Sequence, residues 1–287
     1  MAGETTFDSN PAFSGMAMAM GEISYNCEGM ERKLTLVTPV WEPESGQNPR
    51  FPLVVFVQGS TWTDPDRFFQ LPQLCAYAQQ GVAVASVTHR DCTQGHPFPG
   101  YLKDVKAAVR FLRSRAEEFG LDPERFGLMG TSSGGNAALL CGLTPGDGRY
   151  DTADYAGYPD GARAVAACFA PSDLPAMQAS SGRSPASGGK IVDIMMALIG
   201  QGSVEQTLVA MSPVYEVRDG ARLPAFLLAH GDADEVVPYS QSERMHRRLK
   251  EAGADSRLIR VRGAGHEGSF WSAALHAEIL RFFRKHL

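Results

Sequence analysis

The sequence predicts an α/β protein whose core is a mostly parallel, doubly wound sheet. Short, nearly continuous apolar runs rich in Val, Ala and Phe recur along the chain, at 53–57, 82–87, 126–129, 165–170 and 225–229. Runs of this length without polar alternation are typical of strands that are covered on both faces, as in a parallel sheet. Helix-like segments separate the runs, and this alternation of strand and helix is the pattern of doubly wound folds.

The elements that surround these strands can be assigned in chain order. Residues 20–40, which include Lys33-Leu34-Thr35-Leu36-Val37, are expected to form one or two antiparallel edge strands ahead of the sheet. The clearest helix is 101–119, since Leu102, Val105, Val109 and Leu112 follow one another at spacings of three and four, with Gly120 as its C-cap. The other elements are helices at 71–80, 134–143 and 241–252, a strand at 257–261 and a closing helix at 271–287.

Residues 172–215 interrupt this alternation. A Ser/Gly/Pro-rich stretch, 180–189, leads into 190–199, which is apolar nearly all round. Such an element is either a buried core helix or a lid over a site. A chain of 287 residues can form a single α/β domain. We therefore predict one domain over 1–287, with 172–215 inserted as a lid or cap.

The composition and net charge of the chain exclude some classes of binding partner. The chain is 44% hydrophobic and 21% charged, which is typical of a globular protein, and its formal net charge is −5. No overall attraction to phosphate backbones or anionic lipids follows from this charge, so we expect neither nucleic acid nor a membrane as partner. No run approaches the roughly 18 apolar residues of a membrane span. No positively charged segment precedes the Met/Ala-rich stretch near the N-terminus, so we expect a cytoplasmic protein.

The sequence predicts neither a disulfide framework nor a metal site. Its five cysteines are scattered and form no C-x-x-C pair, which is typical of buried free thiols in a reducing compartment. His266-Glu267 lacks the second histidine of the zinc motif H-E-x-x-H, and no P-loop lysine follows Gly134-Gly135.

The strongest chemical signal is Gly130-Thr131-Ser132-Ser133-Gly134, a G-x-S-x-G sequence between a predicted strand and a predicted helix. In that context the motif predicts a nucleophile elbow, a sharp turn that exposes the hydroxyl of its central serine. The glycines let the strand and helix approach each other, and the helix N-terminus points toward the negative charge that forms on a substrate. Ser132 is the predicted nucleophile, because the two glycines bracket it symmetrically.

A serine nucleophile needs a general base and a carboxylate that orients the base. Asp234 follows the strand at 225–229, and His266 lies in a glycine-rich loop after the strand at 257–261. Both positions are at the carboxyl edge of the sheet, where α/β sites assemble. The neighbouring acids Asp232 and Glu235 are expected to form turns. The histidines near other strand ends, His89, His96 and His230, are expected to have supporting or structural roles.

Acyl transfer also needs backbone N–H groups that bind the oxyanion. The strand at 53–57 ends in Gln58-Gly59-Ser60-Thr61-Trp62, where the pattern H-G-G-G often supplies these donors. Here Gln58 replaces the histidine, and Ser60 and Thr61 replace two glycines. Since the chemistry uses backbone N–H groups, we predict an oxyanion hole built by Gly59, Ser60 and Ser133.

Together these residues resemble the α/β-hydrolase superfamily, and within it the hormone-sensitive-lipase-like carboxylesterases and the bacterial feruloyl-esterase-type (BD-FAE-like) hydrolases. The resemblance extends beyond the triad, over roughly residues 30 to 287. The further matching segments are Phe98-Pro99 with Asp104 and Arg110-Phe111-Leu112, then Asp122-Pro123-Glu124-Arg125, Ala170-Pro171-Ser172-Asp173-Leu174, Ser212-Pro213, and 224–242 with its pattern P-x-L-x-x-H-G-x-x-D-x-x-V-P-x-x-Q-S.

The resemblance implies an α/β-hydrolase fold and a serine esterase that acts through an acyl-enzyme, with Ser132, His266 and Asp234 as its triad. It also implies that the reaction needs no metal and no organic cofactor. It suggests a small ester as substrate, either short acyl or hydroxycinnamoyl. Trp62, Met195 and Met196 could supply an apolar wall for it. Arylformamidase or peptidase activity on this fold stays open, as does a non-catalytic small-molecule receptor. A homodimer through an edge strand or the last helix is one open arrangement.

Overall fold

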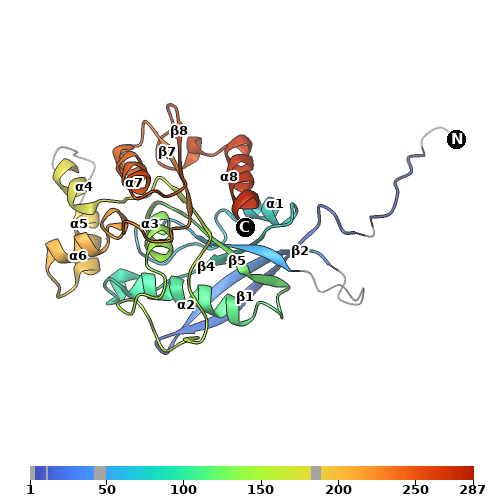
Figure 1. Ribbon diagram of the computed structural model, residues 1–287, viewed down its shortest axis with the longest axis horizontal. Helices are drawn as coiled ribbons and strands as arrows, with labels where there is room; N and C mark the ends of the chain where they lie inside the picture. Colours follow the sequence, from blue (N-terminus) through green and yellow to red (C-terminus); the bar gives the residue numbers. More distant parts are fainter. Residues whose placement is uncertain (1–3, 11, 42–49, 182–188) are drawn as a thin grey trace.

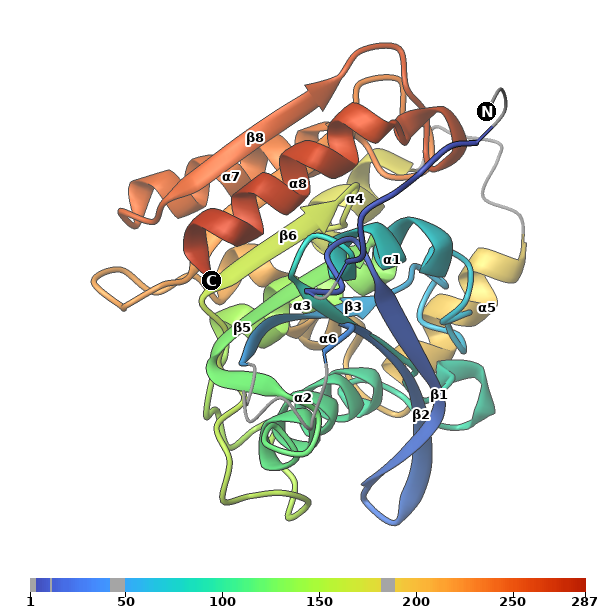
Figure 2. The same cartoon turned by 90° about the vertical axis from the view of Figure 1, so that its right-hand side faces the viewer.

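The computed structural model describes residues 4–10, 12–41, 50–181 and 189–287. Its centre is an eight-stranded sheet in the order β1-β2-β4-β3-β5-β6-β7-β8. The strands are β1 (Ala17–Cys27), β2 (Met30–Pro39), β3 (Phe51–Val57), β4 (Ala83–Val87), β5 (Leu121–Thr131), β6 (Ala164–Cys168), β7 (Ala225–Gly231) and β8 (Ser256–Val261). The six strands from β4 to β8 in this order are parallel to one another. Strands β1 and β2 form an antiparallel hairpin at one edge, and β2 pairs with β4 antiparallel (Figure 2). The predicted mostly parallel sheet with antiparallel edge strands is confirmed.

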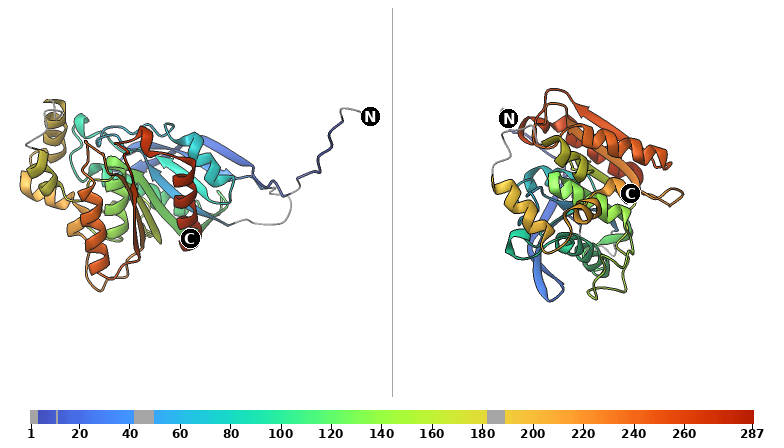
Figure 3. Two further views of the ribbon diagram at one scale, coloured as in Figure 1. Left: turned by 90° about the horizontal axis from the view of Figure 1, so that it is seen from above. Right: turned by 90° about the vertical axis from the view of Figure 1, so that its left-hand side faces the viewer.

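Helices cover both faces of the sheet, as the continuous apolar runs predict. Helices α1 (Leu71–Ala78) and α8 (Ala273–His286) lie on one side, and α3 (Ser132–Leu143) and α7 (Ser240–Glu251) lie on the other (Figures 1 and 3). Helix α2 (Gly100–Ser114) packs beside α3. In strand β3, successive side chains point to opposite faces of the sheet. Val54 and Phe56 pack in the core between the sheet and helices α1 and α8, whereas Val55 packs in the core on the side of α2 and α3.

One predicted helix is shorter in the structure. The helix predicted over 101–119 ends at Ser114, because Arg115 leaves the helical conformation with a φ of −109°. Turns continue the chain to Gly120, which adopts a φ of +64° just before β5 begins. Gly120 therefore ends the connecting turns and not the helix itself.

The described part of the inserted segment 172–215 contains the α-helices α4 (Leu174–Ser181), α5 (Gly189–Ile199) and α6 (Val204–Ala210), followed by the short 3₁₀ helix η3 (Pro213–Tyr215). They gather at the end of the molecule opposite the extended N-terminal segment (Figure 1). Helix α5 buries Ile194 and Leu198 while Val192 and Met196 remain exposed, so it is a surface helix with one packed face. It lies next to the short 3₁₀ helix η2 (Cys92–Gln94). Most of the predicted Ser/Gly/Pro-rich stretch, 182–188, lies outside the described residues.

Candidate active site

Ser132 occupies the sharp turn between β5 and α3, where its φ is +49°. A non-glycine residue in this left-handed region costs roughly 1–2 kcal/mol, so the surrounding structure must hold it there. The two glycines of the motif permit the turn because, without side chains, they let neighbouring backbone segments pack directly against them. A Cβ at Gly130 would lie 2.2 Å from the carbonyl oxygen of Gly134, and one at Gly134 would lie 2.1 Å from that of Val57. Neither position can therefore accept a side chain.

The structure brings Ser132, His266 and Asp234 into one hydrogen-bonded chain. His266 Nε2 lies 3.0 Å from Ser132 Oγ, and His266 Nδ1 lies 2.7 Å from Asp234 Oδ2. Ser132 directly follows β5, and His266 and Asp234 lie in the loops after β8 and β7. These parallel strands end at the same edge of the sheet. An ionised carboxylate can only accept a hydrogen bond, so Nδ1 of His266 donates and Nε2 is left to accept the Ser132 proton.

The surroundings of Asp234 favour its ionised form. Its Oδ1 accepts the backbone N–H groups of Val236 and Val237 at 2.8 and 2.9 Å, and its Oδ2 faces His230 as well as His266. Burial raises the pKa of this carboxyl, but the hydrogen bonds from both histidines and from Val237 outweigh burial and hold the pKa well below its ordinary value. Asp234 is therefore a fixed negative charge beside His266.

The depressed pKa of Asp234 predicts a pH-dependent contribution to stability. A carboxyl whose pKa is lower in the folded state stabilises the protein above its unfolded pKa of about 4, and this contribution is lost as the pH falls. The loss of unfolding free energy in Asp234→Asn should therefore be largest near neutral pH and shrink below about pH 4. Chemical denaturation of both proteins across this range measures it. A loss that stays constant with pH would contradict the assignment.

His230 supports this carboxylate from a fully buried position at the end of β7. Its Nε2 lies 3.2 Å from Asp234 Oδ2 and 2.8 Å from the carbonyl oxygen of Val237, and its Nδ1 lies 2.7 Å from Ser242 Oγ. Both neighbours of Nε2 are acceptors, so this nitrogen carries the proton and donates. Sequence reasoning gave His230 only a general supporting role. Its four-residue spacing from Asp234 was the available signal.

Two further features hold the loop of His266. The ring of Phe169, buried after β6, packs edge-to-face against the imidazole with centroids 4.7 Å apart. Glu267, which has a φ of +65°, accepts hydrogen bonds from Gln58 Nε2 at 3.3 Å and from Trp271 Nε1 at 2.9 Å. Gln58, which stands in place of the H-G-G-G histidine, thus connects the end of β3 to the histidine loop. No residue pattern in the sequence predicts these contacts.

Two of the three predicted oxyanion donors, the N–H groups of Gly59 and Ser60, already make hydrogen bonds within the protein. The N–H of Gly59 donates to Thr131 Oγ1 at 2.8 Å, and the N–H of Ser60 donates to Ser133 Oγ at 3.0 Å. Neither group is free in the structure, because a side-chain hydroxyl already occupies it. The N–H of Ser133 lies in the first turn of α3, where helices leave their N–H groups unpaired. Within the described ranges, the N–H of Thr61 also has no hydrogen-bond partner.

The three predicted substrate-binding side chains do not share one environment. Trp62 is only 6% exposed, and its ring packs in the core next to that of Tyr101, with ring centroids 6.3 Å apart. Met195 is half-buried against the same core, whereas Met196 is 55% exposed. A continuous apolar wall made by all three is therefore not seen, and their contact with a substrate stays a prediction.

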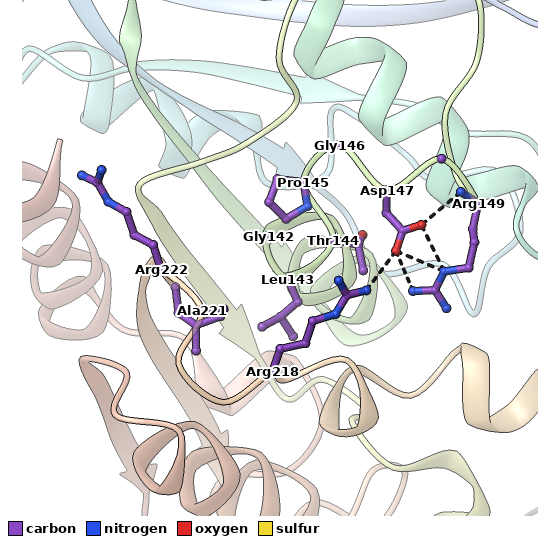
Figure 4. A pocket seen from close by; sticks show the side chains of 12 residues that line it. Gly142, Leu143, Thr144, Pro145, Gly146, Asp147, Arg149, Arg218, Ala221 and Arg222 are labelled. Carbon is purple, nitrogen blue, oxygen red and sulfur yellow. Dashed lines mark hydrogen bonds and ion pairs between the residues drawn. The ribbon is translucent and has the colours of Figure 1, made fainter.

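A hollow of about 470 Å³ lies elsewhere, at the far end of α3 (Figure 4). Its lining includes Gly142 and Leu143 from the end of that helix and Leu223 from just before β7. Ser132 begins the same helix, whose 12 residues span about 18 Å. The arginines at this hollow are already engaged in part, since Asp147 pairs with both Arg149 and Arg218. This hollow is therefore separate from the serine, histidine and aspartate.

Comparisons with known proteins identify the family of this chain. A model of the BD-FAE family matches residues 39–249. Esterase LipC of Mycobacterium tuberculosis is 27% identical over 232 residues, which are 79% of this chain and 55% of LipC. Esterase LipQ of the same organism is 25% identical over 254 residues, 83% of this chain and 54% of LipQ. The chain thus spans about half the length of the curated relatives it matches.

Solved structures show the same architecture. A truncated form of a carbohydrate esterase from gut microbiota superposes with a TM-score of 0.77 at 26% identity, covering 97% of this chain and 99% of that one. Esterase 2 of Thermogutta terrifontis superposes with a TM-score of 0.73 at 22% identity, covering 95% of this chain and 92% of that one. At this identity the similarity supports the fold alone. Across the ranges that the structure describes, no helix has the length and apolar character needed to span a membrane. The protein has an α/β-hydrolase fold, and the chain belongs to the BD-FAE family.

Proposed function

We propose that the protein is a serine carboxylesterase that hydrolyses small esters through an acyl-enzyme. The observation that carries this proposal is the unbroken chain from Ser132 Oγ through His266 to Asp234, with spacings of 3.0 and 2.7 Å. The nucleophile at a φ of +49° and the helix that starts directly at it support the same chemistry. The esterase names of the relatives support the reaction class.

In the proposed first step, Ser132 Oγ attacks the ester carbonyl carbon while its proton passes to His266 Nε2. The resulting imidazolium is stabilised by the ionised Asp234. When the tetrahedral intermediate collapses, His266 gives that proton to the departing alcohol, and the acyl group stays on Ser132. A water molecule then repeats the sequence, releasing the carboxylic acid and restoring the serine hydroxyl.

The oxyanion would be bound by the N–H groups of Ser133 and Thr61. Ser133 directly follows the nucleophile at the start of α3, so its N–H adds to the positive end of the helix dipole. Thr61 lies in the loop next to the nucleophile, where a Cβ placed on Gly59 would meet Ser132 Cβ at 2.8 Å. Both groups are free of other partners in the described part of the chain, unlike those of Gly59 and Ser60.

For the substrate, we propose a short acyl or hydroxycinnamoyl ester. The family resemblance supports this class, and the structural neighbour named as a carbohydrate esterase is compatible with a sugar as the alcohol. The test compares p-nitrophenyl acetate, butyrate and octanoate with methyl ferulate. We expect kcat/KM for acetate or butyrate to exceed that for octanoate by at least about tenfold, because misplacing two or more methylenes costs more than about 1.4 kcal/mol. Folded protein that is inactive on all four esters would overturn the proposed function.

A further inference from the structure

We infer that the hydroxyls of Thr131 and Ser133, on either side of the nucleophile, are positioning groups that hold the oxyanion loop, residues 58–62, against the elbow. This inference rests on the proposed function, since it concerns the loop that would stabilise the transition state. Neither side chain would touch the reacting atoms. Each would act through the backbone of the loop.

The first observation is a matched pair of hydrogen bonds. Consecutive loop residues, Gly59 and Ser60, donate their N–H groups to Thr131 Oγ1 at 2.8 Å and to Ser133 Oγ at 3.0 Å. The two acceptors are the variable positions of the G-x-S-x-G motif, and Thr131 and Ser133 are 0% and 1% exposed. Both acceptor residues are buried and both donor residues are half-buried, so water competes little for the acceptors and the two bonds hold the loop at two adjacent points.

The second observation is that this loop carries backbone strain. Thr61 and Trp62 have φ values of +55° and +60°, in the left-handed region that glycine adopts freely and other residues rarely do. The residues just before and after them close a tight turn, because Ser60 Oγ donates to the Thr63 carbonyl and Thr63 Oγ1 donates to the Ser60 carbonyl, both at 2.6 Å. A strained loop keeps such a conformation only while its surroundings determine it.

The third observation connects the loop to the chemistry. Gly59 lies so close to the elbow that a Cβ on it would be 2.8 Å from Ser132 Cβ. A shift of the loop therefore changes where the Thr61 N–H points relative to Ser132. An oxyanion donor is effective only when it is held in place before the reaction, and removal of one donor in a well-studied protease lowers kcat by about 10² to 10³-fold. Loosening the loop should thus lower kcat more than it changes KM.

Thr131→Val tests this inference, because valine keeps the shape of threonine and removes the acceptor for Gly59. With p-nitrophenyl butyrate, we expect kcat to fall about 10- to 100-fold while KM changes less than about threefold. Thr131→Ser is the matched control, since it keeps the hydroxyl, and it should retain kcat within about threefold. Affinity for a trifluoromethyl ketone, which forms a tetrahedral adduct with the serine, should fall in parallel with kcat.

Ser133→Ala is a second, independent variant if Thr131→Val does not fold, and it should also lower kcat more than it changes KM. Equal losses in Thr131→Val and Thr131→Ser would indicate a packing role and overturn the inference. If the wild-type protein is active and both Thr131→Val and Ser133→Ala keep the wild-type kcat, the inference is also overturned. The proposed function is tested separately in the same assay, since it requires that wild-type turnover be lost in Ser132→Ala.

Discussion

Ester hydrolysis by the Ser132→Ala variant is expected to be about 10⁴- to 10⁶-fold slower in kcat than that of the wild type. Alanine removes the only atom of this residue that lies within reach of His266 Nε2, at 3.0 Å. The fold should be retained, since the strain at a φ of +49° concerns the backbone and the lost hydroxyl is not part of the core. Initial rates with p-nitrophenyl butyrate measure the change, and thermal unfolding checks the fold.

Ser240→Ala provides the matched control for this serine. Ser240 is exposed at the start of α7, and its hydroxyl makes no hydrogen bond within the ranges that the structure describes. Its replacement should leave kcat within about twofold of the wild-type value. Substantial activity in Ser132→Ala would show that another group attacks the ester. The elbow would then have to be reassigned.

Asp234→Asn should lower kcat by about 10⁴-fold with little change in KM, the second largest effect that we expect. The amide of asparagine can donate to His266 Nδ1, which favours the tautomer that carries its proton on Nε2. In that tautomer the imidazole cannot accept the proton of Ser132. Pre-steady-state kinetics with p-nitrophenyl acetate should show the loss in the acylation step.

Asp232→Asn is the corresponding control for the carboxylate. Asp232 lies two residues earlier, but its side chain accepts the N–H of Gly263 at 2.6 Å and pairs with Arg260 at 3.1 Å, at the surface. We expect its kcat to remain within about threefold of the wild-type value. Equal losses in the two variants would mean that the loop, and not the carboxylate beside His266, determines activity.

The sheet was predictable because its signal, a short and nearly continuous apolar run for each strand, is local in the sequence. The apolar runs at 53–57 and 225–229 need cover on both faces, and the helices on the two sides of the sheet provide it. The segment 172–215 was harder to predict. A run such as 190–199 looks apolar all round in sequence, yet only one face of α5 packs, with Ile194 and Leu198 buried and Met196 exposed. Which face packs depends on η2, a neighbour far away in the sequence.

The candidate triad was also predictable from strand ends, because parallel strands bring their following loops to one edge of the sheet. The hydrogen bonds and packing contacts around the triad were not predictable. Whether the N–H of Gly59 is free depends on which rotamer the Thr131 hydroxyl adopts, and that is a property of the folded elbow. The packing of Phe169 on His266 is likewise a property of the folded loop, in which Phe169 has a φ of +41°, and no residue pattern in the sequence predicts it.

Covalent labelling with a fluorophosphonate tests the central claim most directly. This reagent phosphonylates a serine that a neighbouring histidine has activated, and the wild-type protein should take up one phosphonyl group per chain. Peptide mapping by mass spectrometry should place the adduct on Ser132, and loss of ester hydrolysis should follow labelling in proportion. An adduct on Ser133 or another residue, or full labelling with activity unchanged, would contradict the proposed nucleophile.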